Sequence, residues 1–268
     1  MVKLKNIVIW SLIIVNVFFL AFFLGRIIKE HSIKKEALTH LSVLFERNGI
    51  ELDAENIREG GELAELLITR DPTEERKLAE TLLGPVDMTE NGGIYTYTGE
   101  KGQAVFRSGG AFDIQFSEHV YDSITGARNT AKSILQTMGI ETAAPVAVGD
   151  KGNETVEAVC SWERQPIFNC RIRFIFKDGS LAEIRGTYAA TIKAAVKKTD
   201  MSSCATSMMY FLNDVKNDRI SCVRIWSVEP GYMLKAAGDV ISAVWCVDTD
   251  NGVYYVDAGT GNIERETQ

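Results

Sequence analysis

Hydrophobic residues are most concentrated in one uninterrupted run, Ile7 to Gly25 (IVIWSLIIVNVFFLAFFLG), which contains no charged side chain. A helix needs about 20 apolar residues to cross a bilayer core of about 30 Å, so the run predicts an N-terminal transmembrane helix. The alternatives are a cleaved signal peptide and a buried core helix. A signal peptide has a shorter apolar region and a small-x-small cleavage site, whereas Phe22, Phe23 and Leu24 are bulky. We therefore expect residues 1–25 to form a cytoplasmic tail and an uncleaved anchor.

After Gly25 the spacing of apolar residues switches repeatedly between the helical period and the strand period. Asp71 and Pro72 form an N-cap and a first helical position, and Asn48-Gly49 is a helix stop. We expect Gln165 to Phe168 to be an ordinary connection between two strands. Steps of three and four residues predict helices over 26–48, 72–83, 126–138 and 201–215. Alternation predicts strands within 86–117 and over 156–162, 170–176, 181–188, 220–228 and 243–258.

This order of elements predicts an α+β fold in which antiparallel sheets are each covered by helices. We expect a stalk helix and a first α+β lobe over residues 26–122. A second lobe, made of two helix-plus-meander units, is expected over residues 123–268.

Asn251-Gly252 is the strongest hairpin signal in the chain. A two-residue turn at these positions places six residues on one buried face, paired as Thr249 with Tyr254, Val247 with Val256, and Trp245 with Ala258. Asp248 and Asp257 then lie on the opposite face, in solvent. With Asp250 they could form a cation site, but the ligand spacing of a calcium loop is missing, so we prefer a solvated face.

The charge balance narrows the choice of partners. The chain has a net charge of −7, and setting aside Lys3 and Lys5 leaves 27 basic against 36 acidic residues. An acidic excess argues against nucleic acid as a partner.

Charge does not decide which side of the membrane the domain occupies. The flank after the apolar run also carries Lys and Arg, and short tails ahead of an anchor commonly stay inside.

The sequence offers no recognisable catalytic or cofactor motif. The three histidines have no ligand at a zinc spacing, and there is no GxSxG elbow, P-loop or dinucleotide fingerprint. Cys204, near a helix start, could have a lowered pKa, but no local signal places a histidine beside it. All five cysteines lie in apolar or strand-like contexts, so we expect small buried hydrophobes, with one disulfide left open. We predict a non-enzyme without metal, cofactor or small-molecule substrate.

Several segments, taken in order, resemble a known family. They are NGIELDAENI (48–57), ITRDPTEERKLAETLLG (68–84), FKDGSLAEIRGTY (176–188), FLNDVKN (211–217), EPGY (229–232) and AVWCVDTDNGVYYVDAGTG (243–261). Together they are similar to the YycH/YycI-type regulatory proteins of Gram-positive bacteria, more so to YycI, and the closing hairpin also resembles the PepSY-like pattern. Val244 and Cys246 around the tryptophan depart from the usual family pattern. The resemblance implies a domain outside the cell membrane that modulates the sensor histidine kinase of a two-component system.

We therefore expect a single-pass membrane regulator with its N-terminus in the cytoplasm and an extracytoplasmic domain. Its partners are expected to be a membrane sensor histidine kinase and a paralogous single-span regulator. Candidate partner-binding residues are Asn16, within the apolar run, and Trp245 and Tyr254 in the closing hairpin. The alternative is a PepSY-like binding module that restrains a peptidase or contacts cell-wall polymer.

Overall fold

The structure is a computed structural model of the chain. It describes residues 15–20, 22, 23, 33, 35–58, 63–123, 125–148, 154–187, 192–194 (backbone only), 202–235 and 240–266. Most of the predicted anchor therefore lies outside the described residues, and what is described of it is helical at 15–20 and 22–23. No helix within these ranges combines the length and the apolar character needed to cross a membrane.

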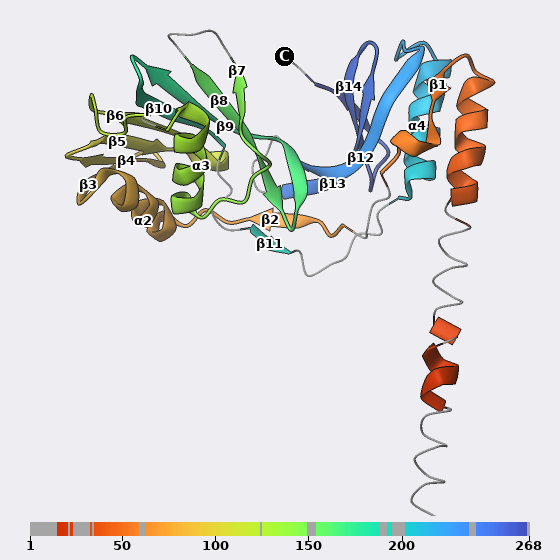
Figure 1. The fold of residues 1–268 in the computed structure, drawn as a ribbon, viewed down its shortest axis with the longest axis horizontal. Helices are drawn as coiled ribbons and strands as arrows, with labels where there is room; N and C mark the ends of the chain where they lie inside the picture. The colour runs from red at the N-terminus through yellow and green to blue at the C-terminus, as the bar shows by residue number, and fades with distance from the viewer. Residues whose placement is uncertain are drawn as a thin grey trace, which may run out of the picture.

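Two lobes lie side by side in the molecule (Figure 1). The first, here the α2–α3 lobe, contains α2 (Pro72–Leu83), β3 (Val86–Asn91), β4 (Ile94–Gly99), β5 (Gly102–Phe106), β6 (Ala111–Phe116), α3 (Ala127–Met138), β7 (Val146–Val148), β8 (Thr155–Trp162), β9 (Gln165–Lys177) and β10 (Ser180–Thr187). The second, here the α4 lobe, contains the helix of residues 35–46, β1 (Glu51–Leu52), η1 (Ala54–Asn56), α4 (Cys204–Lys216), β12 (Arg224–Leu234), β13 (Val240–Thr249), β14 (Gly252–Asp257) and β15 (Ile263–Arg265). Between the lobes run β2 (Leu66–Ile68) and β11 (Ile192–Ala194).

The predicted fold class is wrong, because the strands join into one large mixed sheet instead of separate helix-covered antiparallel sheets. Among the residues described, the sheet has 15 strands, with a main path β11-β2-β13-β12-β9-β10-β6-β5-β4-β3. Two of its pairings are parallel, β1 with β12 and β12 with β9, the latter through Tyr232 and Ile167. The predicted boundary near residue 122 falls between β6 and α3, and β6 pairs with β10 across it.

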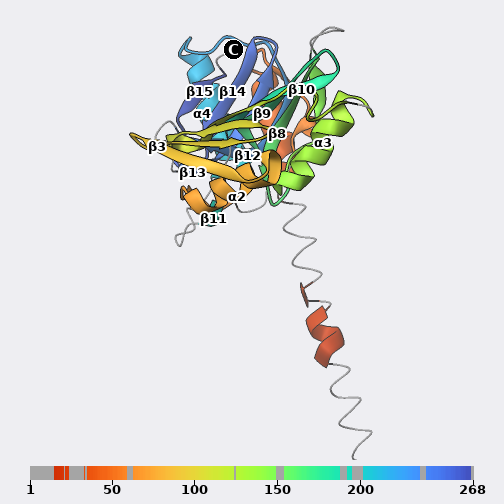
Figure 2. The same ribbon diagram turned by 90° about the vertical axis from the view of Figure 1, so that its left-hand side faces the viewer.

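Each lobe has its own core, and the central strand β12 contributes to both. Near its start, Ile225 and Val228 pack with the helix of 35–46 and α4 in the α4 lobe. Near its end, Tyr232 packs into the core beneath α2 and α3. Seen from the side, α2 and α3 lie against the strands of their lobe (Figure 2). β12 therefore connects the two cores, because its backbone pairing with β13 continues from one lobe into the other.

The helix cap, helix end and turn that the sequence predicts have the expected conformations at several places. Asp71 caps α2 by accepting a hydrogen bond from the Thr73 N–H at 2.9 Å. Gly139 ends α3 in the left-handed conformation, and Asp178 and Gly179 take φ of 50° and 80° in the turn between β9 and β10. The prediction for Gln165 to Phe168 was wrong, since these residues begin β9 and Ile167 is fully buried.

The closing hairpin keeps its predicted inner face but not its predicted register. Thr249 pairs with Gly252, Val247 with Tyr254, and Trp245 with Val256, a shift of two residues. Asp250 and Asn251 form the turn, and Gly252 takes φ of 121° after it. Contacts from outside the hairpin hold this turn: Asp250 accepts from the Val223 and Arg224 N–H groups, and Asn251 donates to the Ser221 carbonyl. Because the shift is even, the same side chains still face the core.

The outer face of the hairpin is also covered, contrary to the prediction of a solvated face. Val244, Cys246 and Tyr255 form a small third cluster with Met233. Asp257 is only 7% exposed and pairs with Lys235. The hairpin is therefore buried on both faces, as in a central strand pair.

Candidate functional site

The residues predicted to bind a partner are not brought together on one surface. Trp245 and Tyr254 are 3% and 5% exposed and belong to the core of the α4 lobe. The Trp245 indole donates to the Ser202 carbonyl at 3.1 Å, and the Tyr254 ring packs edge-to-face against Phe211. Asn16 lies in the helical residues 15–20, with an exposed side chain. Burial thus gives Trp245 and Tyr254 structural roles, and exposed residues nearby become the better candidates for contact.

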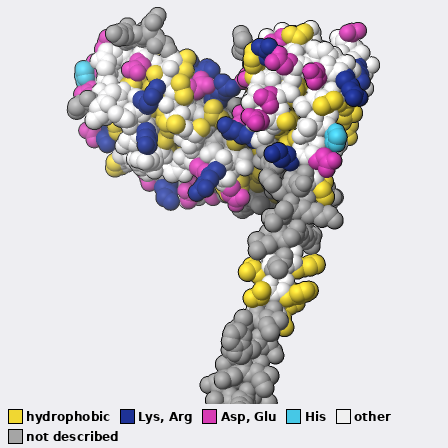
Figure 3. Space-filling model, turned by 45° about the vertical axis from the view of Figure 1, so that its right-hand side comes forward, with side chains coloured by type: hydrophobic (Ala, Val, Ile, Leu, Met, Phe, Trp, Pro, Cys, Tyr) yellow, Lys and Arg dark blue, Asp and Glu magenta, His cyan; other side chains and the backbone are white. Residues whose placement is uncertain are grey.

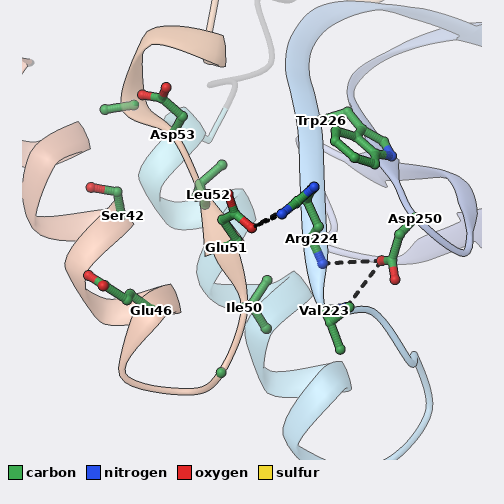
Figure 4. A pocket seen from close by; sticks show the side chains of 12 residues that line it. Ser42, Glu46, Ile50, Glu51, Leu52, Asp53, Val223, Arg224, Trp226 and Asp250 are labelled. Carbon is green, nitrogen blue, oxygen red and sulfur yellow. Dashed lines mark hydrogen bonds and ion pairs between the residues drawn. The ribbon is translucent and has the colours of Figure 1, made fainter.

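An open cleft of about 840 Å³ lies on the α4 lobe (Figure 4). One wall is the helix of 35–46 with the chain that follows it, and the other is the start of β12 with the β13–β14 turn. The lining residues are Ser42, Glu46, Gly49, Ile50, Glu51, Leu52, Asp53, Ala54, Val223, Arg224, Trp226 and Asp250. Its volume falls within the range of about 300–1,000 Å³ that is common for binding sites.

A Schellman turn builds the first wall. Gly49, at φ of 77°, donates to the Glu46 carbonyl, and Ile50 donates to the Phe45 carbonyl at 3.0 Å. Ile50 and Phe45 are both buried in the same core, which is the apolar contact expected of this motif. The chain then turns back so that Glu51 donates its N–H to the Val223 carbonyl and β1 pairs with β12. The predicted helix stop at Asn48-Gly49 therefore also fixes one side of the cleft.

A β-bulge builds the second wall. Ile225 pairs with Thr249 and Ser227 with Asp248, so Trp226 is an extra residue between two adjacent pairs. Ile225 and Val228 both point into the core, which strict alternation would not allow. The bulge leaves Trp226 47% exposed at the edge of the cleft, beside Val223, which is 65% exposed.

The charges in the cleft are mostly negative. Arg224 pairs with Glu51, with Nε 2.7 Å from Oε2, and its guanidinium lies 4.9 Å from the centre of the Trp226 ring. Asp250 accepts from two backbone N–H groups at 3.1 and 3.2 Å. The lining thus contains four carboxylates, those of Glu46, Glu51, Asp53 and Asp250, against one guanidinium.

The cysteines have the character of core residues. All five are free and buried, and burial raises the pKa of Cys160, Cys170, Cys204 and Cys246 to about 12. The lowered pKa considered for Cys204 is therefore wrong, because the thiol packs in the core at the start of α4. Within the described residues no three His, Cys, Asp or Glu side chains are grouped so as to hold a metal ion.

No protein-family model matches the chain, and no curated protein matches it. Among solved structures, it is similar to the Bacillus megaterium YpeB C-terminal domain, with 13% sequence identity and a TM-score of 0.36 over 75% of this chain and 99% of that one.

Proposed function

We propose that this protein is a non-enzymatic, membrane-attached regulator that binds a sensor histidine kinase of a two-component system through the cleft of the α4 lobe. A paralogous single-span regulator would be a second partner. The observation that carries the proposal is the outward display of Trp226 next to Arg224 at the edge of an open cleft. Trp and Arg are the side chains most enriched among residues that dominate protein–protein binding energy.

The apolar N-terminal segment supports membrane attachment. Figure 3 shows hydrophobic side chains on this segment below the domain. Those that the structure describes are between 51% and 67% exposed: Val15, Val17, Phe18, Phe19, Leu20, Phe22 and Phe23. An apolar patch of this kind needs a protein or membrane environment. We propose the membrane, with the N-terminus in the cytoplasm and the domain outside the cell.

The position of the cleft in the sequence favours a partner in the same membrane. Ser42, on the cleft wall, follows the end of the apolar segment at Gly25 by 17 residues. A fully extended chain of that length reaches at most about 60 Å, and a helical one about 26 Å. A kinase anchored in the same bilayer would therefore present its membrane-proximal part at the height of the cleft.

Site-specific photo-cross-linking in intact cells tests this function. A photoreactive residue at position 223, which is exposed on the cleft wall, should capture a sensor histidine kinase identified by mass spectrometry. The matched control is position 88 on β3, because Met88 is 46% exposed on the other lobe. Capture of a peptidase, or equal capture from both positions, would count against the kinase.

Membrane attachment and topology have a separate test. The full-length protein should stay with membranes after alkaline carbonate extraction, and external protease should remove a C-terminal tag from intact cells. Release by carbonate, or a tag that is cleaved only after lysis, would contradict the proposed location.

A further inference from the structure

We infer that the cleft recognises a cationic segment of its protein partner, in which Lys or Arg side chains lie among the cleft carboxylates and against the exposed part of the Trp226 ring. This inference rests on the proposed function, since it names the chemistry by which the partner is bound.

The first argument is the uneven charge of the lining. Among the described residues that line the cleft, the one cationic side chain is that of Arg224, and it already pairs with Glu51. In the described part of the chain, Glu46, Asp53 and Asp250 form no ion pair with a lysine or arginine of the protein itself. The two aspartates accept hydrogen bonds from backbone N–H groups: Asp53 accepts from Glu55, and Asp250 from Val223 and Arg224. The cleft therefore offers negative charge that no other described lysine or arginine neutralises.

The second argument is the exposed aromatic ring. A cation placed over an indole is attracted by the negative face of the ring, and Trp is the best of the three aromatic residues for this contact. Arg224 already occupies one such position, with its guanidinium 4.9 Å from the ring centre. Because Trp226 remains 47% exposed, a second cationic side chain can reach the ring from the cleft.

The same features disfavour other ligands. An acidic peptide or an anionic lipid headgroup would place like charges next to the three carboxylates, which is costly and selects against such partners. A purely apolar segment would cover Val223 and Trp226 but would leave those carboxylates desolvated without partners. A segment that combines basic and apolar side chains satisfies both parts of the lining.

A positional-scanning library of nine-residue peptides tests the inference with the full-length protein in detergent micelles. At 50 mM salt, positions fixed as Lys or Arg should give at least about tenfold more bound peptide than positions fixed as Asp or Glu. Raising the salt to 500 mM should remove most of this preference, because the screening length falls well below 10 Å. A preference for acidic residues, the absence of any charge preference, or no binding would overturn the inference.

Three variants locate the binding. Trp226→Ala should weaken the best basic peptide by about threefold to thirtyfold, as expected for loss of a cation–π contact. Glu46→Gln should weaken it by about twofold to fivefold, the range of an exposed ion pair. Glu90→Gln, on exposed β3 of the other lobe, is the matched control and should have no effect. Equal binding by all three variants would overturn the inference.

The outcome separates this inference from the proposed function. Cross-linking of a kinase at position 223 without a preference for basic peptides would refute only the charge recognition. A clear basic preference with no kinase cross-link would leave the recognition intact and refute the choice of partner.

Discussion

The Lys235 ammonium lies 2.7 Å from the Asp257 carboxylate and joins the end of β12 to the end of β14. Asp257 also accepts hydrogen bonds from the Gly259 and Thr260 N–H groups, at 3.0 and 2.9 Å. This one side chain therefore closes the turn after β14 and ties it to the residue that follows β12, on the far side of β13.

Replacing Asp257 should destabilise the domain although the residue was expected in solvent. Asp257→Ala leaves two backbone donors without their acceptor and leaves the partly buried Lys235 ammonium with Glu264 alone, 3.6 Å away, at a cost of about 2–3 kcal/mol. Asp248→Ala on the same hairpin is the control, because Asp248 is partly exposed, and should change stability by less than about 0.5 kcal/mol. Urea unfolding of both variants measures the difference, and equal midpoints would contradict the assigned role.

Low pH should reduce the free energy of unfolding, because the carboxylates of Asp257 and Glu157 become protonated. Burial alone would raise the pKa of Asp257, but hydrogen bonds from Lys235 and the Thr260 N–H, together with the lysine charge, lower it. The pKa of Glu157 is likewise lowered, since its hydrogen bonds from Arg173 and Arg171 outweigh the effect of burial. A lowered native pKa stabilises the fold above the unfolded pKa of about 4, and this stabilisation is lost as the pH falls through the native value.

The double variant Glu157→Gln/Asp257→Asn tests this pH dependence. Its free energy of unfolding should be lower than that of the parent at pH 7 and should fall less steeply between pH 5 and pH 2. Parallel curves for the two proteins would show that other groups carry the acid sensitivity.

Replacing Arg70 should destabilise the fold more than is usual for a partly exposed residue. Its guanidinium is 2.7 Å from the carboxylate of Glu75, which is 4% exposed, and it also donates to the Phe106 carbonyl. Arg70→Met leaves a buried carboxylate unpaired and should cost about 3 kcal/mol. Arg76→Met removes an exposed i,i+4 pair with Glu80 on the same helix and should cost less than about 0.5 kcal/mol. Thermal unfolding compares them, and similar losses would contradict the prediction.

Gly231 allows the close approach of β12 and β9. A Cβ atom at this position would lie 2.6 Å from Cε2 of Phe168 and 2.8 Å from the Pro166 carbonyl oxygen. Gly231→Ala should therefore destabilise the protein by about 1–3 kcal/mol through overpacking. Ser227→Ala, earlier in the strand, serves as the control with little expected change. Hydrogen exchange should show the loss concentrated at the β9–β12 junction, and unchanged protection there would contradict this explanation.

The local part of the fold was predictable because its signals are local. The cap at Asp71, the stop at Gly139 and the Asp178-Gly179 turn each act through residues a few positions apart. The short strands β1, β2 and β11 were missed, since two or three residues show no period. The union of all strands in one sheet depends on pairings such as β2 with β13, which no short stretch of sequence encodes.

The candidate site was missed for a related reason. Trp245 and Trp226 both lie in strand-like sequence, and alternation alone does not say which one is buried. The one available signal was the spacing of Ile225, Trp226 and Val228, which breaks the period of two and is typical of a bulge. The Asn251-Gly252 signal gave the hairpin but the wrong register, because contacts from Val223 and Ser221 hold the turn at Asp250 and Asn251.

The extra residue in β12 divides that strand into two stretches whose inward and outward positions alternate out of phase. Ile225 is the last inward position of the first stretch, and Val228 is the first of the second. Deleting Trp226 would remove the bulge and leave Ile225 and Val228 two residues apart, so both side chains would still face the core in a regular strand. The core does not require the extra residue at this point of the chain; its effect is on the surface, where it displays the Trp226 side chain at the edge of the cleft.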